Sequence, residues 1–220
     1  IGAIPKKLKK TDPKRFFDID KDILSKVHKG IQEYKTSEYG NPYSYLLFYI
    51  VQYLGFRPSE VVSLRWSKNQ DLKELQNYVD LEKKVFIYEK IKNHNMIKKG
   101  YPKLVPIPDK VLKLIDELPR LEGNPYLLPA NSSAPKKHYQ NWQKAWARVE
   151  KLGQFKLNLR DLRPVFITLS AFEIGVEETQ SYIGHSDKKM TEYYIKRLPE
   201  EEINRVNKLF NNAIKKYKQA

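Results

Sequence analysis

One apolar segment limits the folds open to this chain more than any other part of the sequence. Asn41 and Pro42 open it, as an N-cap residue followed by a proline at the first helical position. Apolar side chains then recur at helical spacing until Gly55, where the helix should end: Leu46, Leu47, Ile50, Val51 and Leu54. A helix this apolar is expected to be buried, so the fold must be built around it.

A second helix should follow almost directly. Pro58 can occupy a first helical position. The apolar residues that come after it would point inward: Val61, Val62 and Leu64. Arg57 therefore falls at the junction of two helices whose ends are fixed by packing. A guanidinium in this place is positioned before any ligand arrives.

The rest of the chain predicts more helices and one β-hairpin. Residues 84–108 are rich in β-branched and aromatic side chains on both sides of Gly100, which favours two strands joined by a long tip. Helices are expected at about 109–118, 137–152, 161–174, 176–183, 187–196 and 200–217. The sequence thus predicts an α+β fold, mostly α-helical with a small antiparallel β-sheet. It is not a doubly wound nucleotide-binding design, and it contains no glycine-rich phosphate loop.

The charge balance points to a polyanionic partner. Lysine and arginine total 41 against 26 acidic residues, a formal net charge of +15, which attracts nucleic acid even at physiological salt. The alternative interpretation is a lysine-rich surface that serves only solubility, as in proteins of heat-loving organisms.

Several classes of protein are excluded by what the sequence lacks. Without cysteine, the chain cannot be a disulfide scaffold, a zinc ribbon or an enzyme with a thiol nucleophile, and an intracellular protein is expected. The four histidines show no metal-ligand spacing, so neither a metal nor another cofactor is predicted. No apolar run approaches the ~20 residues of a membrane-spanning helix, and a membrane partner is not expected.

Three short motifs carry a resemblance to a known family. The first is GFRPSEVVSLRW (residues 55–66), in which a glycine, an apolar residue and an arginine lead into a Ser-Glu helix that ends Leu-Arg-Trp. The second is LRDLR (159–163), and the third is IGHS (183–186), with a tyrosine nine residues after its histidine. In this order they resemble the catalytic domain of the tyrosine recombinases, the phage integrase family, from about residue 15 onward. The resemblance implies a tyrosine recombinase catalytic fold.

The resemblance implies four site residues directly. Arg57 and Arg163 would be the arginines that bind the reacting phosphate, because two guanidiniums can hold its charge bidentately. His185 would donate a hydrogen bond to the same phosphate. Counting nine residues from this histidine selects Tyr194, rather than the adjacent Tyr193, as the nucleophile.

Two further positions fit the family less simply. The family places a general-acid lysine in the hairpin, and KKGYPKLVP (98–106) resembles its turn, which implies Lys98, with Lys99 as the alternative. In the second motif, Arg160 stands where the family usually has histidine, and Pro164 replaces a second histidine. Arg160 could stabilise phosphate charge but could not act as a general base. Water, the histidine of the third motif or a neighbour would then deprotonate the tyrosine.

The implied function is that of a site-specific DNA recombinase or integrase from a virus, plasmid or other mobile element, and the composition is compatible with an archaeal source. Such an enzyme cleaves and rejoins DNA through a 3′-phosphotyrosyl intermediate, with neither metal nor ATP. One alternative is a type IB topoisomerase-like or chromosome-dimer-resolving enzyme, since the same residues support all of these reactions. The other is a non-enzymatic DNA-binding protein on the same scaffold, because the second motif lacks its histidine.

The implied organisation has three parts. Residues 1–15 would be a basic linker from a missing N-terminal DNA-binding region, and residues 16–198 the catalytic domain. Residues 199–220 would form a C-terminal helix that docks on its own domain or on a neighbouring protomer. The expected partner is double-stranded DNA at attachment sites, bound by a homotetramer, while the isolated domain could be a monomer. The expected location is the cytoplasm or nucleoid of the host cell.

Overall fold

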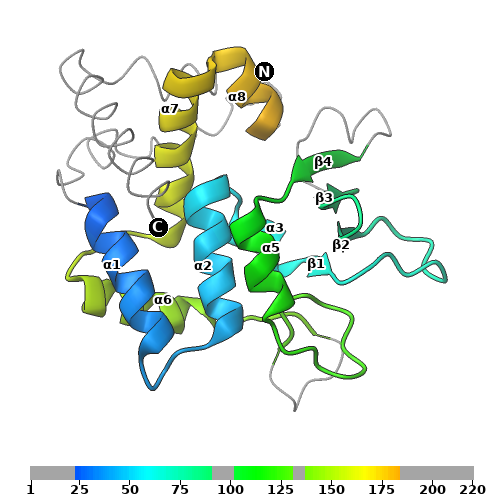
Figure 1. Cartoon of the computed structure of the whole chain (residues 1–220), viewed down its shortest axis with the longest axis horizontal. Coiled ribbons are helices and arrows are strands. Elements are labelled where there is room, and N and C mark those ends of the chain that lie inside the picture. Colours follow the sequence, from blue (N-terminus) through cyan, green and yellow to red (C-terminus); the bar gives the residue numbers. More distant parts are fainter. Residues whose placement is uncertain (1–22, 91–101, 131–136, 184–220) are drawn as a thin grey trace, which may run out of the picture.

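A computed structural model of the chain describes residues 23–90, 102–130 and 137–183 (Figure 1). Its centre is α2 (Pro42–Leu54), which is buried without interruption from residue 44 to residue 51. The side chain of Asn41 caps the helix by accepting hydrogen bonds from two backbone N–H groups of the first turn, at 2.9 and 3.1 Å. Gly55 ends the helix in the left-handed conformation, at φ 65°. The predicted buried helix is therefore confirmed, together with both of its ends.

Further helices surround α2 (Figure 1). On one side of α2 lie α1 (Ile23–Thr36) and α6 (Trp142–Gly153), and on the other lie α3 (Pro58–Val62) and α5 (Asp109–Asp116). A 3₁₀ turn, η2 (Leu159–Asp161), leads into α7 (Leu162–Ile174), which packs on α2 and on α8 (Val176–Ile183). The C-terminal end of α2 and the N-terminal end of α7 thus come together.

The helix α1 was not predicted from the sequence, although its buried positions recur at helical spacing: Ile23, Val27, Gly30, Ile31 and Tyr34. It packs against α6, and the two backbones approach closely at two glycines. A Cβ on Gly30 would lie 2.5 Å from the carbonyl oxygen of Val149, and a Cβ on Gly153 would lie 2.4 Å from that of Lys26. A side chain at either position would force the helices apart.

Four short strands form a sheet beside the helices: β1 (Leu64–Arg65), β2 (Asn77–Asp80), β3 (Val85–Tyr88) and β4 (Lys103–Pro106), in the order β1-β2-β3-β4. The predicted hairpin is confirmed, since β3 pairs antiparallel with β4 and Tyr88 lies opposite Lys103. The β2 strand also pairs antiparallel with β3, but β1 and β2 are parallel. The sheet is therefore mixed rather than wholly antiparallel, and its short β1 edge gave no signal in the sequence.

The remaining predicted helices agree with the structure where it describes them. The helices α5, α7 and α8 begin and end within two residues of their predicted bounds, whereas α6 begins at Trp142 and not at residue 137. The residues before it form a β-bridge, in which His138 pairs with Pro129. Predicted segments 1–15, 187–196 and 200–217 lie outside the described residues. Among the helices described, none combines the length and the apolar character needed to span a membrane. The fold is α+β and mostly helical, as predicted.

Candidate active site

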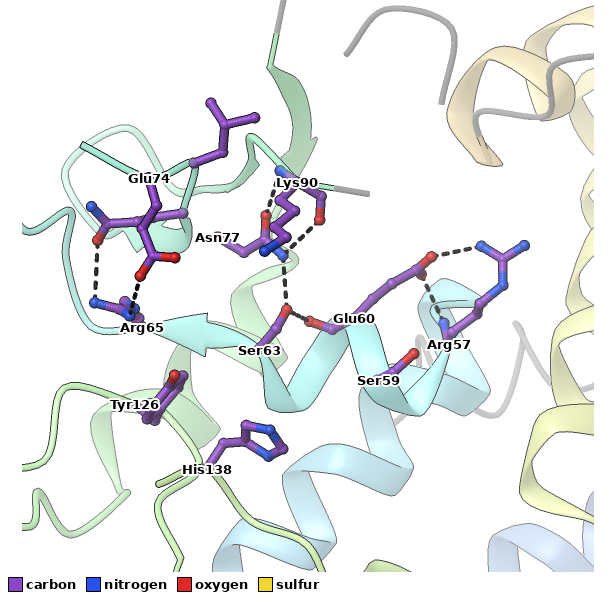
Figure 2. A pocket seen from close by; sticks show the side chains of 12 residues that line it. Arg57, Ser59, Glu60, Ser63, Arg65, Glu74, Asn77, Lys90, Tyr126 and His138 are labelled. Atoms are coloured by element: carbon purple, nitrogen blue, oxygen red, sulfur yellow. Dashed lines mark hydrogen bonds and ion pairs between the residues drawn. The ribbon is translucent and has the colours of Figure 1, made fainter. Parts of the chain in front are cut away.

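Arg57 lies at the junction of α2 and α3, as the sequence predicts. Its backbone is extended (φ −72°, ψ 142°), and Pro58 occupies the first helical position after it. Glu60 reaches back from the third helical position and accepts a hydrogen bond from the backbone N–H of Arg57 at 2.9 Å. The other oxygen of Glu60 accepts from the Arg57 guanidinium at 2.7 Å (Figure 2). One carboxylate therefore fixes both the backbone and the side chain of this arginine, which is still 47% exposed.

Arg163 reaches the same carboxylate from α7. Its Nη1 atom lies 3.6 Å from Glu60 Oε2 and donates a 2.7 Å hydrogen bond to the carbonyl oxygen of Gly55. Its other terminal nitrogen lies 3.5 Å from the carbonyl oxygen of Ile183, at the end of α8. The side chain is only 9% exposed. The structure thus brings together the two arginines predicted from separate motifs, and Glu60 is the group that joins them.

A buried lysine completes this cluster. In β4 the burial alternates so that Lys103 faces inward at 7% exposure, while its neighbour Leu104 faces outward at 59%. The Lys103 ammonium lies 5.0 Å from the centre of the Phe56 ring and 5.4 Å from that of Tyr182. Burial lowers the pKa of Lys103 to about 7, opposed by Glu60 and assisted by the positive charges of Arg163 and Arg57.

A cavity of about 620 Å³ opens beside Arg57 (Figure 2). Its floor is the outer face of α3, where Ser63 accepts a 2.8 Å hydrogen bond from the side chain of Asn77. The same asparagine bonds the backbone of Lys90 through both its amide oxygen and its amide nitrogen, at 2.9 and 3.0 Å. His138 closes the opposite wall (Figure 2). The lining is polar and can accept a charged ligand that also contacts Arg57.

Arg160 has a different setting from the two clustered arginines. It is exposed, and its backbone N–H donates to the side chain of Asn158 at 3.0 Å. Its side chain lines a second cavity of about 600 Å³, whose other walls come from α1, from α6 and from residues 154–161. Within the described residues, this cavity shares no lining residue with the one beside Arg57. The structure therefore does not bring Arg160 to the cluster, and its place in the site stays a prediction.

The other predicted site residues cannot be placed. Lys98, Lys99, His185 and Tyr194 lie outside the described residues, as does Tyr193. What is described is the part of the site that was predicted to bind phosphate, where two guanidiniums lie around one carboxylate. Over residues 23–90, 102–130 and 137–183, no group of three or more acidic or histidine side chains is arranged to hold a metal ion.

Two residues of the cluster were not predicted as functional. Glu60 was predicted only as part of the first motif, although a glutamate three residues after an N-cap can reach back to the backbone there. Lys103 was predicted only as a strand residue. Its inward direction could have been inferred from its spacing to Val105, because residues two apart in a strand share one face.

Comparisons with known proteins identify the family of this chain and support its fold. The family model described as the phage integrase family matches residues 24–201, and the chain belongs to that family. Among solved structures, XerA recombinase is similar to it at 18% sequence identity, with a TM-score of 0.57 over 86% of this chain and 61% of that one. Lambda integrase, crystallised as a dimer bound to a COC′ core site, gives 15% identity and a TM-score of 0.53 over 78% of this chain and 57% of that one.

These likenesses support the fold, which is that of tyrosine recombinase catalytic domains. The chain spans about three fifths of the length of these structures. A comparison with curated proteins finds no match.

Proposed function

We propose that this chain is the catalytic part of a site-specific DNA recombinase or integrase, which cleaves and rejoins duplex DNA through a 3′-phosphotyrosyl intermediate. The observation that carries the proposal is the Arg57–Glu60–Arg163 cluster, because it holds two guanidiniums around one carboxylate at the edge of a polar cavity. Membership of the phage integrase family supports it. So does the net charge of +15, which suits a DNA partner.

The proposed chemistry follows from the charges of these groups. The Tyr194 phenolate attacks the phosphorus, and negative charge gathers on the two non-bridging oxygens of the phosphodiester. Arg57 and Arg163 stabilise that charge, and removing one such donor typically costs 10²–10³-fold in rate. The 5′ oxygen leaves with a proton from Lys98, or from Lys99. The reverse steps rejoin the strand without ATP, because the phosphotyrosyl bond conserves the energy of the phosphodiester.

Glu60 holds the two arginines in position and competes only weakly with the phosphate for their hydrogen bonds. Its oxygens are already occupied by a backbone N–H group and by the two guanidiniums. Among the described residues, Arg57, Arg163 and Glu60 carry two positive charges and one negative charge, which together attract an anion. Since Arg57 is half exposed, its guanidinium can turn from Glu60 to a phosphate, while the buried Arg163 stays fixed by the carbonyl oxygen of Gly55.

Arg160, His185 and residues 199–220 complete the proposal. His185 would donate to the phosphate, and Arg160 would contribute positive charge if DNA binding draws it in. The C-terminal segment would dock between protomers of a tetramer on DNA. The reaction would take place in the cytoplasm or nucleoid of the host cell.

A suicide substrate tests the proposal directly. The chain is incubated in EDTA with a nicked duplex that on cleavage releases a short fragment with a 5′ hydroxyl end, using candidate attachment sites and nonspecific sequence. We expect an adduct that is stable in SDS, absent in Tyr194→Phe and retained in Tyr193→Phe. Tight, salt-sensitive DNA binding without an adduct would instead support a non-enzymatic DNA-binding protein. Relaxation of supercoiled DNA without strand exchange would support the topoisomerase-like alternative.

A further inference from the structure

The charge of Lys103 lies at a buried position where it costs stability, and this cost calls for a functional explanation. Inward positions of a strand normally carry apolar side chains, but β4 buries Lys103 and exposes Leu104. Bringing an ammonium out of water without a close ionic partner is unfavourable. What surrounds Lys103 is mainly aromatic, with Phe56 on one side and Tyr182 on the other. Packing alone would be served better by an apolar residue.

Among the described residues, charged and titratable groups lie near Lys103 on α3, α7, α8 and β3. Glu60 belongs to α3, and its charge favours a protonated lysine. Arg57 at the start of α3 and Arg163 in α7 oppose protonation, because they carry the same charge. Tyr182 of α8 is largely buried, and burial keeps the pKa of its phenol raised, so it stays neutral at ordinary pH. The same holds for Tyr88 of β3, which lies opposite Lys103 in the sheet.

This arrangement makes the charge of Lys103 depend on whether an anion is bound. Without a ligand, burial disfavours a charged lysine at this position, and the positive charges of Arg163 and Arg57 act in the same direction, against Glu60. A bound phosphate adds negative charge and accepts hydrogen bonds from the same two guanidiniums. Glu60 then loses part of its neutralisation, and a protonated lysine beside it becomes favourable.

We propose that Lys103 is a positioning residue for this reaction, which takes up a proton when a DNA phosphate binds to Arg57 and Arg163 and then helps to neutralise Glu60. The proton comes from solvent and goes to the Nζ lone pair, and no bond of the DNA changes in this step. The inference rests on the proposed function, because it takes DNA as the ligand and Arg57 and Arg163 as the residues that bind its phosphate. A pKa of about 7 before binding is consistent with it, because the amine is then largely unprotonated at pH 8.

The test is calorimetric measurement of proton uptake. An uncleaved duplex is titrated into the Tyr194→Phe chain at pH 8, in two buffers with different enthalpies of ionisation, HEPES and Tris. The difference in heat gives the number of protons taken up. We expect about 0.9 of a proton at pH 8, about 0.5 at pH 7 and very little at pH 6, because the lysine is already protonated there.

Two substitutions and a control assign the proton to one residue. Lys103→Met keeps an unbranched side chain between the two rings, and Lys103→Arg keeps a charge that cannot titrate; both should abolish the uptake at pH 8. Lys144→Met removes an exposed lysine from α6 and should leave the uptake intact. A purely packing role for Lys103 would show the same uptake in all three variants, which would overturn the inference.

A second measurement separates this inference from the proposed function. Adduct formation is measured against pH in Lys103→Arg, with Tyr194 restored, and in the unsubstituted chain. The unsubstituted chain should show a titration near pH 7, and Lys103→Arg should lack it. Adduct formation, together with proton uptake that does not depend on Lys103, would refute the inference but not the proposed recombinase function. Uptake that depends on Lys103 without any adduct would support the inference and count against recombination. A chain that binds no DNA would overturn both.

Discussion

The left-handed turn at Gly55 gives a prediction that links the central helix to the site. Gly55 ends α2 with φ 65°, and its carbonyl oxygen accepts the 2.7 Å hydrogen bond from Arg163. A Cβ at this position would lie 2.2 Å from Cδ1 of Phe166. The substitution Gly55→Ala should therefore meet two separate penalties, one from the backbone conformation and one from the ring.

Gly123 separates these two penalties. It has a similar backbone, with φ 73°, but an added Cβ would meet nothing within 4 Å. An alanine in the left-handed conformation costs roughly 1–2 kcal/mol, partly offset by the reduced freedom of the unfolded chain, so Gly123→Ala should lose about 1 kcal/mol. Displacing the Phe166 ring adds about 1–3 kcal/mol of overpacking. We therefore expect Gly55→Ala to lose about 2–4 kcal/mol.

Urea unfolding followed by tryptophan fluorescence measures both variants against the parent chain. The expected result is a lower midpoint for Gly55→Ala than for Gly123→Ala, with unchanged slopes. Equal losses of unfolding free energy in the two variants would refute the reasoning, because the ring would then give way at no cost. A second variant makes the contacted side chain smaller: Phe166→Leu combined with Gly55→Ala should recover part of the loss.

Two further predictions concern charges in the site. Lys103 has a pKa of about 7 in the folded chain against an ordinary value of 10.5, so the unfolded chain binds more protons between these values and the free energy of unfolding should rise with pH in this window. Lys103→Met should remove that rise and increase the free energy of unfolding at pH 7 by about 2–4 kcal/mol. Urea titrations of both chains from pH 6 to 9.5 measure this, and parallel pH profiles of the two chains would contradict it. Glu60→Gln keeps an acceptor for the Arg57 backbone but removes the negative charge that lies 3.6 Å from buried Arg163, so it should lose about 1–3 kcal/mol and most adduct formation. Glu33→Gln is the control, because its ion pair with Lys29 has the same 3.6 Å distance but is exposed, and its loss should stay below about 0.5 kcal/mol.

The elements that could be predicted from the sequence are those with local signals. The helix junction at Arg57 was predicted correctly because the residues that set the helix ends act within one or two turns of the chain: Asn41, Pro42, Gly55 and Pro58. The helix α1 was missed although its buried residues recur at helical spacing, and it packs mainly on α6, more than a hundred residues away in sequence. The parallel pairing of β1 with β2 was missed because a two-residue strand is defined only by its partner.

The site residues also divide into those that the sequence predicted and those whose role depends on contacts in the folded chain. The motifs located Arg57 and Arg163, but nothing in their spacing showed that Glu60 would contact both of them. Lys103 was missed because its importance depends on groups from α3, α7 and α8 that meet only in the folded chain. The setting of Arg160 was likewise not visible, since it depends on how η2 is oriented against α6.

The burial of α2 on all sides has a consequence for how activity should fail. Sites carried on surface loops can open locally while the rest of the protein stays folded. Here the first arginine and the carbonyl oxygen that holds the second are attached to the end of a helix that forms the middle of the core. Heat or denaturant cannot loosen these groups without disrupting that core. Loss of the proposed DNA cleavage and loss of the fold should therefore coincide, and selection on one of these properties would also be selection on the other.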